Sequence, residues 1–197
     1  SRCRRKVINA DSVERVRGIE GDAATSYFSV FPHLILNQKE SFVFKGRNRR
    51  PPKDAVNAML SFVYTLISND VTAALETVGL DPYVGFMHAL RPGRPSLALD
   101  IMEELRAYLG DRLVLSLINR KQITGNQFLQ QGDESIIMTD DARRTIISAW
   151  QARKKEQIQH PFLNEKVSIG LLPHIQAMML ARYLRNDLDD YPVFLIQ

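Results

Sequence analysis

Residues 11–31 have the sequence DSVERVRGIEGDAATSYFSVF, whose periodicity predicts an amphipathic helix. At about 100° per residue, the side chains that share its apolar stripe are Val13, Val16, Ala23, Ala24, Tyr27 and Phe31. Glu20 falls in the middle of this stripe. A carboxylate there is costly unless a basic partner, a shared proton or a metal ion compensates its charge. Gly18 and Gly21 flank Glu20, and because each costs about 1 kcal/mol relative to alanine in a helix, we expect something to approach the backbone closely there.

The rest of the chain is expected to be mainly α. A capping box at Asp11 and Glu14 begins the first helix, and residues 1–10 are interpreted as a linker. Further helices are predicted over 53–78 with a bend near 69–70, 96–109 with Ser96 as its cap, 111–120 capped by Asp111, 139–159 and 169–185. Residues 126–138 are expected to form one small β-hairpin, the only strand pair predicted, and an extended tail follows at 191–197.

Composition limits the class of protein. The 197 residues are 45% hydrophobic, enough for one large domain or a domain with a small appendage. No transmembrane helix is expected, because no uncharged apolar run reaches about 18 residues. The single cysteine, Cys3, rules out an internal disulfide framework and fits a reducing cytoplasm. The chain opens on SRCRR, which we interpret as the interior of a longer protein.

The net charge of +4 is compatible with nucleic acid but does not identify it as a partner. Basic residues cluster at 2–6, 45–50, 91–94 and 153–155. Those at 45–50 and 91–94 lie in stretches that contain glycine or proline, and a loop suits phosphate contact better than a helix face does. Ordinary solvated faces remain the alternative interpretation.

The helix after Ser96 carries Asp100, Glu103 and Glu104, and His88 lies just upstream. Carboxylate oxygens favour Mg²⁺ or Mn²⁺, and an imidazole shifts the preference toward Mn²⁺. A solvated acidic face is the alternative, because the spacing matches no local metal motif. The competing histidines adjoin prolines and are interpreted as structural: His33, His160 and His174. The sequence contains no Gly-rich phosphate loop, Gly-x-Ser-x-Gly motif or zinc-type cysteine pattern.

Several motifs together resemble the CRISPR-associated endonuclease/integrase family Cas1. They are RGIEG at 17–21 followed by YF at 27–28, NAML at 57–60 with Tyr64, GLDPYVGFMH at 79–88, RPSLALDIMEE at 94–104, and DRLV at 111–114 with INR at 118–120. These motifs cover most of residues 11–125 in the family's order. The ending, LRNDLD at 184–189 and YPVFL at 191–195, is most similar to the type I-C branch.

The resemblance implies a multi-helical catalytic domain that follows a β-rich N-terminal domain absent from this sequence. Residues 1–10 would then be a linker remnant and 11–197 the catalytic domain, with a core at 11–125 and a hairpin and helices at 126–197. It also implies Glu20, His88 and Glu103 as ligands of a catalytic Mg²⁺ or Mn²⁺. Asp100 matches a second acid that supports the site or binds the metal through water.

The implied reaction is insertion of short foreign DNA fragments into a CRISPR array by transesterification at the repeat. The implied partners are double-stranded and branched DNA, CRISPR repeat DNA, a second copy of the chain and the bridging protein Cas2, in a prokaryotic cytoplasm without a membrane. The positions matched to DNA contact are Tyr27, Lys53, Asn57, Arg91 and Arg94. Capping, core hydrogen bonding and a solvated loop are their ordinary alternatives. The competing function is a helical DNA-binding module without catalysis.

Overall fold

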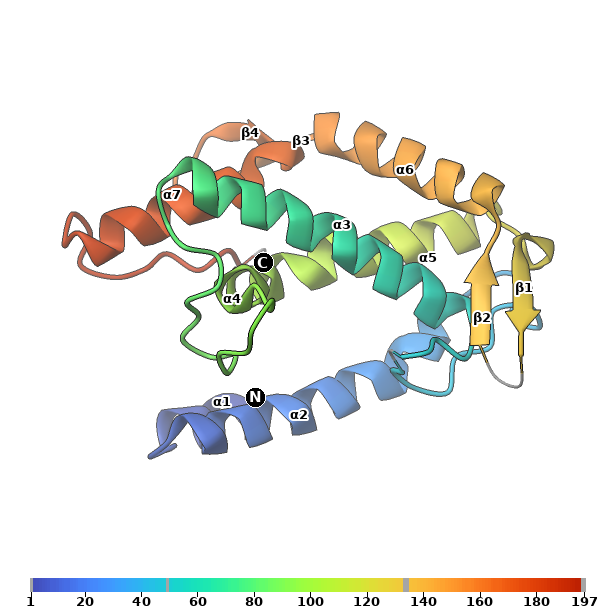
Figure 1. Ribbon diagram of the computed structural model, residues 1–197, viewed down its shortest axis with the longest axis horizontal. Helices are drawn as coiled ribbons and strands as arrows, with labels where there is room; N and C mark the ends of the chain where they lie inside the picture. Colours follow the sequence, from blue (N-terminus) through green and yellow to red (C-terminus); the bar gives the residue numbers. More distant parts are fainter. Residues whose placement is uncertain (1, 49, 133–134, 196–197) are drawn as a thin grey trace. The chain divides into compact units, whose positions relative to one another are not determined.

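The computed structural model describes residues 2–48, 50–132 and 135–195. Within them the chain is mainly α-helical, with two small antiparallel hairpins (Figure 1). The fold class expected from the sequence is therefore confirmed. The chain forms two compact units, one from residues 1–59 and 115–139 and the other from 60–114 and 140–197. The predicted division into a core at 11–125 and a C-terminal part at 126–197 stays a prediction.

The first unit contains α1 (Arg2–Ile8), α2 (Val13–Val30), the 3₁₀ turns η1 (Phe31–Leu34) and η3 (Gly125–Gln127), and the strands β1 (Phe128–Gln131) and β2 (Ser135–Met138). The second contains α4 (Ser96–Leu105), the π-helical segment η2 (Arg106–Asp111), α6 (Asp140–Lys155), β3 (Gln157–Gln159), β4 (Lys166–Ser168), η4 (Ile169–Leu171) and α7 (Leu172–Leu184). Helices α3 (Ala55–Thr77) and α5 (Arg112–Asn119) contribute residues to both units.

Aromatic rings form much of the core of the first unit. Phe28, Phe31 and Phe44 lie with ring centroids 5.2–5.9 Å apart, and Phe42 packs edge-on against Phe128 of β1. Aromatic pairs at these separations stabilise a core beyond the area they bury. The cluster explains why the irregular segment after η1 is ordered: alternate phenylalanines, at 42 and 44, are buried.

Helix α3 supplies the core of the second unit. Its side chains at 63, 67, 71 and 75 are completely buried, as the spacing of one helical face requires. The helix is long and apolar enough to cross a membrane by length and composition, but half of its most apolar stretch is buried inside the protein. Core helices of this kind meet the same criterion, so the apolarity of α3 is explained by packing.

The helix predicted over 96–109 changes character after Leu105. Residues 106–111 form a π-helical segment, in which each turn holds more residues than in an α-helix. Leu105, Leu109, Leu113 and Leu117 follow one another at steps of four residues, and all are buried. In an ideal α-helix four residues overshoot one turn by about 40°. The wider turn therefore helps to keep this row of leucines on one buried side.

Several local predictions from the sequence are wrong. The expected linker contains helix α1, and Ser12, not the predicted capping box, caps α2 by accepting from Arg15 N–H. Helix α3 runs unbroken through residues 69–70, where a break or bend was expected. Asp111 lies in the π-helical segment rather than at a cap, and Ser96 is the first residue of α4 rather than its cap. Gly79, at φ 81°, follows the end of α3 in a left-handed conformation, and its N–H bonds Glu76 O.

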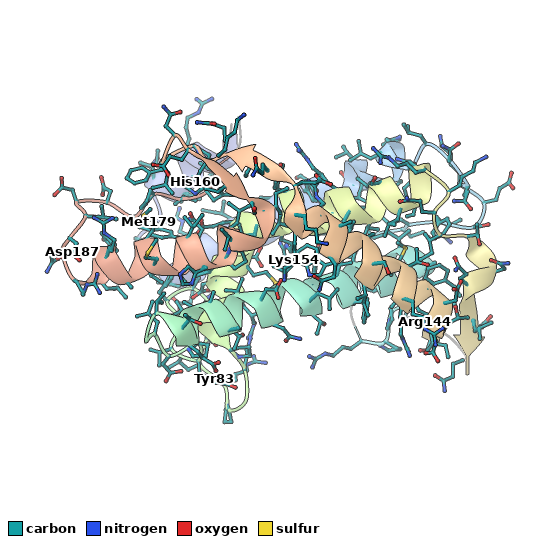
Figure 2. The ribbon with its side chains drawn as sticks, turned by 90° about the horizontal axis from the view of Figure 1, so that it is seen from above. Tyr83, Arg144, Lys154, His160, Met179 and Asp187 are labelled. Atoms are coloured by element: carbon teal, nitrogen blue, oxygen red, sulfur yellow. The ribbon has the colours of Figure 1, made fainter. Side chains whose placement is uncertain are left out.

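The hairpin predicted at 126–138 is confirmed as β1 paired with β2, in register from Phe128–Met138 to Gln131–Ser135. Part of its predicted turn lies outside the described residues. A second hairpin, β3 with β4, was not predicted. It replaces the end of the helix expected to reach residue 159, which stops at Lys155. On α6, Lys154 (labelled in Figure 2) forms an ion pair of 2.7 Å with Asp70 of α3.

Candidate functional site

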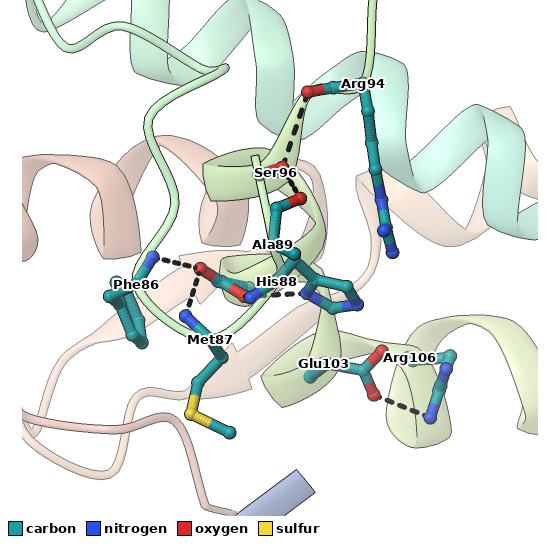
Figure 3. Close-up of polar contacts among 9 residues, drawn as sticks. Phe86, Met87, His88, Ala89, Arg94, Ser96, Glu103 and Arg106 are labelled. Atoms are coloured by element: carbon teal, nitrogen blue, oxygen red, sulfur yellow. Dashed lines mark hydrogen bonds and ion pairs between the residues drawn. The ribbon is translucent and has the colours of Figure 1, made fainter. Parts of the chain in front are cut away.

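The site begins with a loop that folds onto one buried carboxylate. Asp100 of α4 accepts backbone N–H groups from Phe86, Met87 and His88 at 2.7, 3.0 and 2.9 Å, and the Nδ1 atom of His88 lies 2.7 Å from its Oδ1 (Figure 3). The Asp100 side chain is 0% exposed. The alternative interpretation of a solvated acidic face is therefore wrong for Asp100, because the loop covers this side chain.

The contacts of Asp100 select one tautomer of His88. Three N–H groups already donate to this carboxylate, an arrangement suited to an ionised acid that can only accept. Nδ1 of His88 therefore carries a proton and donates to Oδ1, which leaves the lone pair on Nε2. Among the described residues, none forms a hydrogen bond with Nε2, and the side chain is 22% exposed. A histidine oriented by a carboxylate in this way is the usual form of a metal ligand.

Gly85 allows the loop to approach Asp100. A Cβ atom built on Gly85 would lie 2.7 Å from Oδ2 of Asp100 and 2.7 Å from the backbone carbon of Ser96. Such distances are far inside van der Waals contact, so a larger residue would push the loop off the helix. Gly85 is therefore needed because no side chain fits between this loop and α4.

The second candidate ligand, Glu103, is one turn beyond Asp100 on the same helix, so the two acids are neighbours on its surface. Its Oε2 is 2.6 Å from Nη2 of Arg106 (Figure 3). The Arg106 guanidinium lies 5.3 Å from the ring centre of Tyr64, whose hydroxyl donates to Oδ1 of Asp111 at 2.5 Å. Glu103 is half-buried and already faces a cation, so its surroundings suit a negative charge.

Glu20 does not occupy the buried position predicted for it. It is exposed on α2, and the buried side chains of that helix are Ile19 and Phe28. A Cβ atom added at Gly18 or Gly21 would meet no other atom within 4 Å, so no close packing explains these glycines. Of the apolar stripe, Val13 and Tyr27 are exposed and only Phe31 is buried. The cost of burying a charge therefore does not arise at this helix.

The donor types fit a hard divalent cation, because they comprise one imidazole nitrogen and carboxylates. Within the described parts of the chain, no group of three or more His, Cys, Asp or Glu side chains is arranged to hold a metal ion. Glu20 belongs to the first unit, and His88 and Glu103 belong to the second. The second unit therefore supplies an oriented His88 and the Glu103 turn, and the complete three-ligand set stays a proposal.

The residues matched to DNA contact have different surroundings. Lys53, Arg91 and Tyr27 are exposed, and Arg94 is partly exposed. In Figure 3 the Arg94 side chain extends past Ser96 in the direction of the His88 ring. Asn57 is the exception, because it is 0% exposed.

The buried amide of Asn57 organises the basic loop at 45–50. It accepts from Arg47 Nη1 and Asn48 N–H and donates to Gly46 O and Asp54 Oδ2. The expectation that Asn57 contacts DNA is therefore corrected, because a fully bonded interior amide cannot reach a solvent-side ligand. It is a positioning residue for that loop.

Sequence analysis missed two residues near the candidate site. Arg106 is three residues after Glu103, and this spacing on a helix was a usable signal for an ion pair. Glu104 was grouped with a solvated acidic face, but it is half-buried and bonded to residues 72–90 positions away. No local pattern could reveal partners so distant in sequence.

Comparison with known proteins gives the family. The family model described as CRISPR associated protein Cas1 matches residues 1–152. The chain is 57% identical over 192 residues to "CRISPR-associated endonuclease Cas1 1" of Chlorobaculum tepidum, covering 98% of this chain and 56% of that protein. It is 53% identical over 186 residues to "CRISPR-associated endonuclease Cas1" of Leptospira interrogans, covering 94% and 73%. The chain thus spans about half to three-quarters of the length of these relatives.

Solved structures share the fold. A Cas1 protein from Thermotoga maritima matches with a TM-score of 0.83 and 31% identity, over 93% of this chain and 56% of that one. A casposase bound to its integration product matches with a TM-score of 0.85 over 98% of this chain and 55% of that one, and at 24% identity it shows the fold alone. The family match, the curated relatives and the shared helical architecture lead to one conclusion: this chain belongs to the Cas1 family.

Proposed function

We propose that the chain carries the catalytic helices of a DNA endonuclease/integrase that inserts short foreign DNA fragments into a CRISPR array by transesterification at the repeat. Family membership supports the reaction class, because curated relatives bear the name endonuclease. The observation that carries the proposal is the pairing of His88 with buried Asp100, which leaves an oriented imidazole nitrogen at the surface. A nucleic-acid-binding module has no need of a histidine held in this way.

The residues that would hold Mg²⁺ or Mn²⁺ are His88, Glu103 and Glu20. His88 and Glu103 belong to one unit, and the exposed Glu20, which belongs to the other, is the third member of the proposed set. When bound, such an ion supplies activation of a 3′-hydroxyl and neutralisation of charge on the phosphoryl oxygens. Asp100 acts through His88, because it fixes the orientation of the ring and its tautomer.

Nearby side chains suit the handling of DNA. Arg91 and Arg94 follow His88 in the same loop and offer cations to phosphates. The same loop exposes Tyr83 and Phe86, whose exposed fractions are 47% and 57%. Aromatic rings beside cations are the usual means of binding bases and backbone together. We therefore assign the scissile phosphate and its flanking nucleotides to the 83–94 loop, with Lys53 and Tyr27 as further contacts from the first unit.

The partners proposed are double-stranded and branched DNA, CRISPR repeat DNA, a second copy of the chain and Cas2. One of the matched structures is a Cas6-RT-Cas1–Cas2 complex, with a TM-score of 0.85 and 28% identity over 98% of this chain and 21% of that one. Another is a casposase bound to its integration product. We retain type I-C as the proposed subtype on the basis of the C-terminal sequence alone.

The test is Mn²⁺-dependent strand transfer of a short DNA fragment into repeat-containing DNA by the purified protein. We expect His88→Ala to abolish strand transfer and His33→Ala, which changes an exposed histidine on η1, to leave it intact. DNA affinity should be unchanged in both variants. Equal strand transfer by the two variants would contradict the proposal. DNA binding without metal-dependent strand transfer in the unmodified protein would instead favour the binding module.

A further inference from the structure

A second enclosed carboxylate, the half-buried Glu104, holds the C-terminal segment of the chain. Its Oε1 accepts from the Tyr191 hydroxyl at 2.6 Å, and its Oε2 accepts from Phe194 N–H and from Nε2 of Gln176, both at 2.8 Å. We call residues 191–194 the strap. Burial raises the pKa of Glu104, although these hydrogen bonds act in the opposite direction. Burial, reinforced by the Glu104 charge, also raises the pKa of Tyr191.

The orientation of Gln176 is fixed from its other side. His160 (labelled in Figure 2) is 1% exposed, and its Nδ1 accepts backbone N–H groups from Phe162 and Leu163. Its Nε2 therefore carries the proton and lies 3.3 Å from Oε1 of Gln176. The amide nitrogen of Gln176 must then face the strap, where it contacts the Tyr191 hydroxyl and Pro192 O. Fully paired networks of this kind hold one arrangement.

The strap also packs against the helical segment just beyond Glu104. Phe194 is 2% exposed, and its ring lies edge-on to Tyr108 at 5.9 Å and 5.7 Å from the ring of His160. Tyr108 belongs to the π-helical segment that follows α4. The strap therefore contacts both sides of the junction at which α4 stops being a regular helix.

This junction carries the candidate ligand Glu103. Adjacent residues on a helix point about 100° apart, so Glu103 and Glu104 emerge from one turn in different directions. Glu103 is paired with Arg106, the first residue of the π-helical segment. The backbone N–H of Arg106 still bonds Met102 O, as in an α-helix, so Glu103 and Glu104 share one hydrogen-bonded turn. Contacts that hold Glu104 therefore also fix the direction of Glu103.

We infer that the strap is a positioning device: by holding Glu104 through Tyr191, Gln176 and Phe194, it sets the direction in which Glu103 presents its carboxylate to the metal. This inference rests on the proposed function, since it needs Glu103 to be a ligand. Tyr191 and Glu104 touch neither metal nor DNA and act through the helix turn. The strap thus couples the last part of the chain to a site formed more than eighty residues earlier.

Tyr191→Phe tests the inference, because it keeps the ring and removes one hydrogen bond to Glu104. Mn²⁺ affinity, measured by electron paramagnetic resonance on the purified protein, should weaken by about tenfold. This is the lower end of the loss seen when a residue that orients a metal ligand is replaced. Phe194→Leu, which loses the contact with Tyr108, should weaken it in the same direction. Tyr183→Phe is the matched control, because Tyr183 is an exposed tyrosine on α7, and its Mn²⁺ affinity should equal that of the unmodified protein.

The outcomes separate this inference from the function on which it rests. If Tyr191→Phe and Phe194→Leu lower the melting temperature but leave Mn²⁺ affinity unchanged, the strap is structural only and the inference is wrong. If the unmodified protein binds no Mn²⁺, or if His88→Ala binds it equally well, the proposed metal site itself fails. Weaker Mn²⁺ binding in both strap variants, with His88→Ala weaker still, supports both.

Discussion

Replacing Asp100 by asparagine changes one oxygen for an amide group and leaves the shape of the side chain intact. Four donors surround this side chain, two on each oxygen: Phe86 and Met87 N–H on Oδ2, and His88 N–H and Nδ1 on Oδ1. An asparagine has one acceptor oxygen, so two donors must face an NH₂ group. The backbone donors at Phe86 and Met87 cannot adapt, whereas the imidazole can change tautomer.

We therefore expect the amide oxygen of Asp100→Asn to remain with Phe86 and Met87, and the NH₂ group to face His88. His88 Nδ1 then becomes an acceptor and Nε2 carries the proton, which removes the lone pair that a metal needs. The backbone N–H of His88 loses its partner as well. A hydrogen bond to a charged group contributes about 1.5–3 kcal/mol, so the free energy of unfolding should fall by about 3 kcal/mol.

Two measurements check this expectation. Nitrogen-15 NMR of histidine-labelled protein reports the His88 tautomer, and a Mn²⁺ titration reports the affinity, which should fall by about 10- to 100-fold. Asp189→Asn, which changes an exposed aspartate, is the matched control and should alter neither quantity. The reasoning is refuted if Asp100→Asn retains the proton on Nδ1 and binds Mn²⁺ as tightly as the unmodified protein.

Three further predictions follow from the packing. Gly85→Ala should lower the free energy of unfolding by about 1–3 kcal/mol, because the added Cβ atom meets Asp100 and Ser96. Gly18→Ala, which places its Cβ atom in open space on a helix, should raise it by up to about 1 kcal/mol. Urea unfolding measures both changes, and equal effects would contradict the difference in space around the two glycines. Asn57→Ala should cost about 2–3 kcal/mol in the same assay, since its four partners lose their bonds, and a neutral result would remove its role in holding the basic loop. Because the pKa of Tyr191 is raised in the folded state, its contribution to stability is complete below about pH 10 and is lost as the pH rises further. In thermal melts from pH 9 to 11, the free energy of unfolding of the unmodified protein should fall by up to about 1.4 kcal/mol per pH unit more than that of Tyr191→Phe. Parallel curves for the two proteins would contradict a raised pKa of Tyr191.

Periodicity predicted most of the helices because their buried faces follow the helical repeat. Helix α7 and the first hairpin were found in this way. It failed where the chain changes geometry without a change in composition. Gly110 and Asp111 led to the prediction of a helix end at 109 and a new start at 111, but nothing in RAYLGD indicated that the helix continues through a π-helical segment. The second hairpin is only three residues long on each side, too short for alternation to be visible.

The candidate site was only partly predictable for a different reason. Residue chemistry identified His88 and the acids of α4, and the resemblance to Cas1 assigned predicted roles to His88, Asp100 and Glu103. It could not show that Asp100 is covered, because the covering loop consists of backbone N–H groups that any sequence provides. The same periodicity placed Glu20 in a stripe, but a stripe is buried only where another element packs on it, and of the six stripe residues only Phe31 is buried.

The π-helical segment gives this region one place that can absorb a change in chain length. A π-helical turn holds about one residue more than the α-helical turn that it interrupts. Removal of one residue from 106–111 would therefore let the segment close into an ordinary α-helix and leave the helices on either side in nearly the same register. Leu113, now 5% exposed, would keep its place in the buried row. The change would fall on the turn after Glu103, where Arg106 and Tyr108 make their contacts, so a one-residue gap there in a sequence alignment would indicate a different arrangement around Glu103.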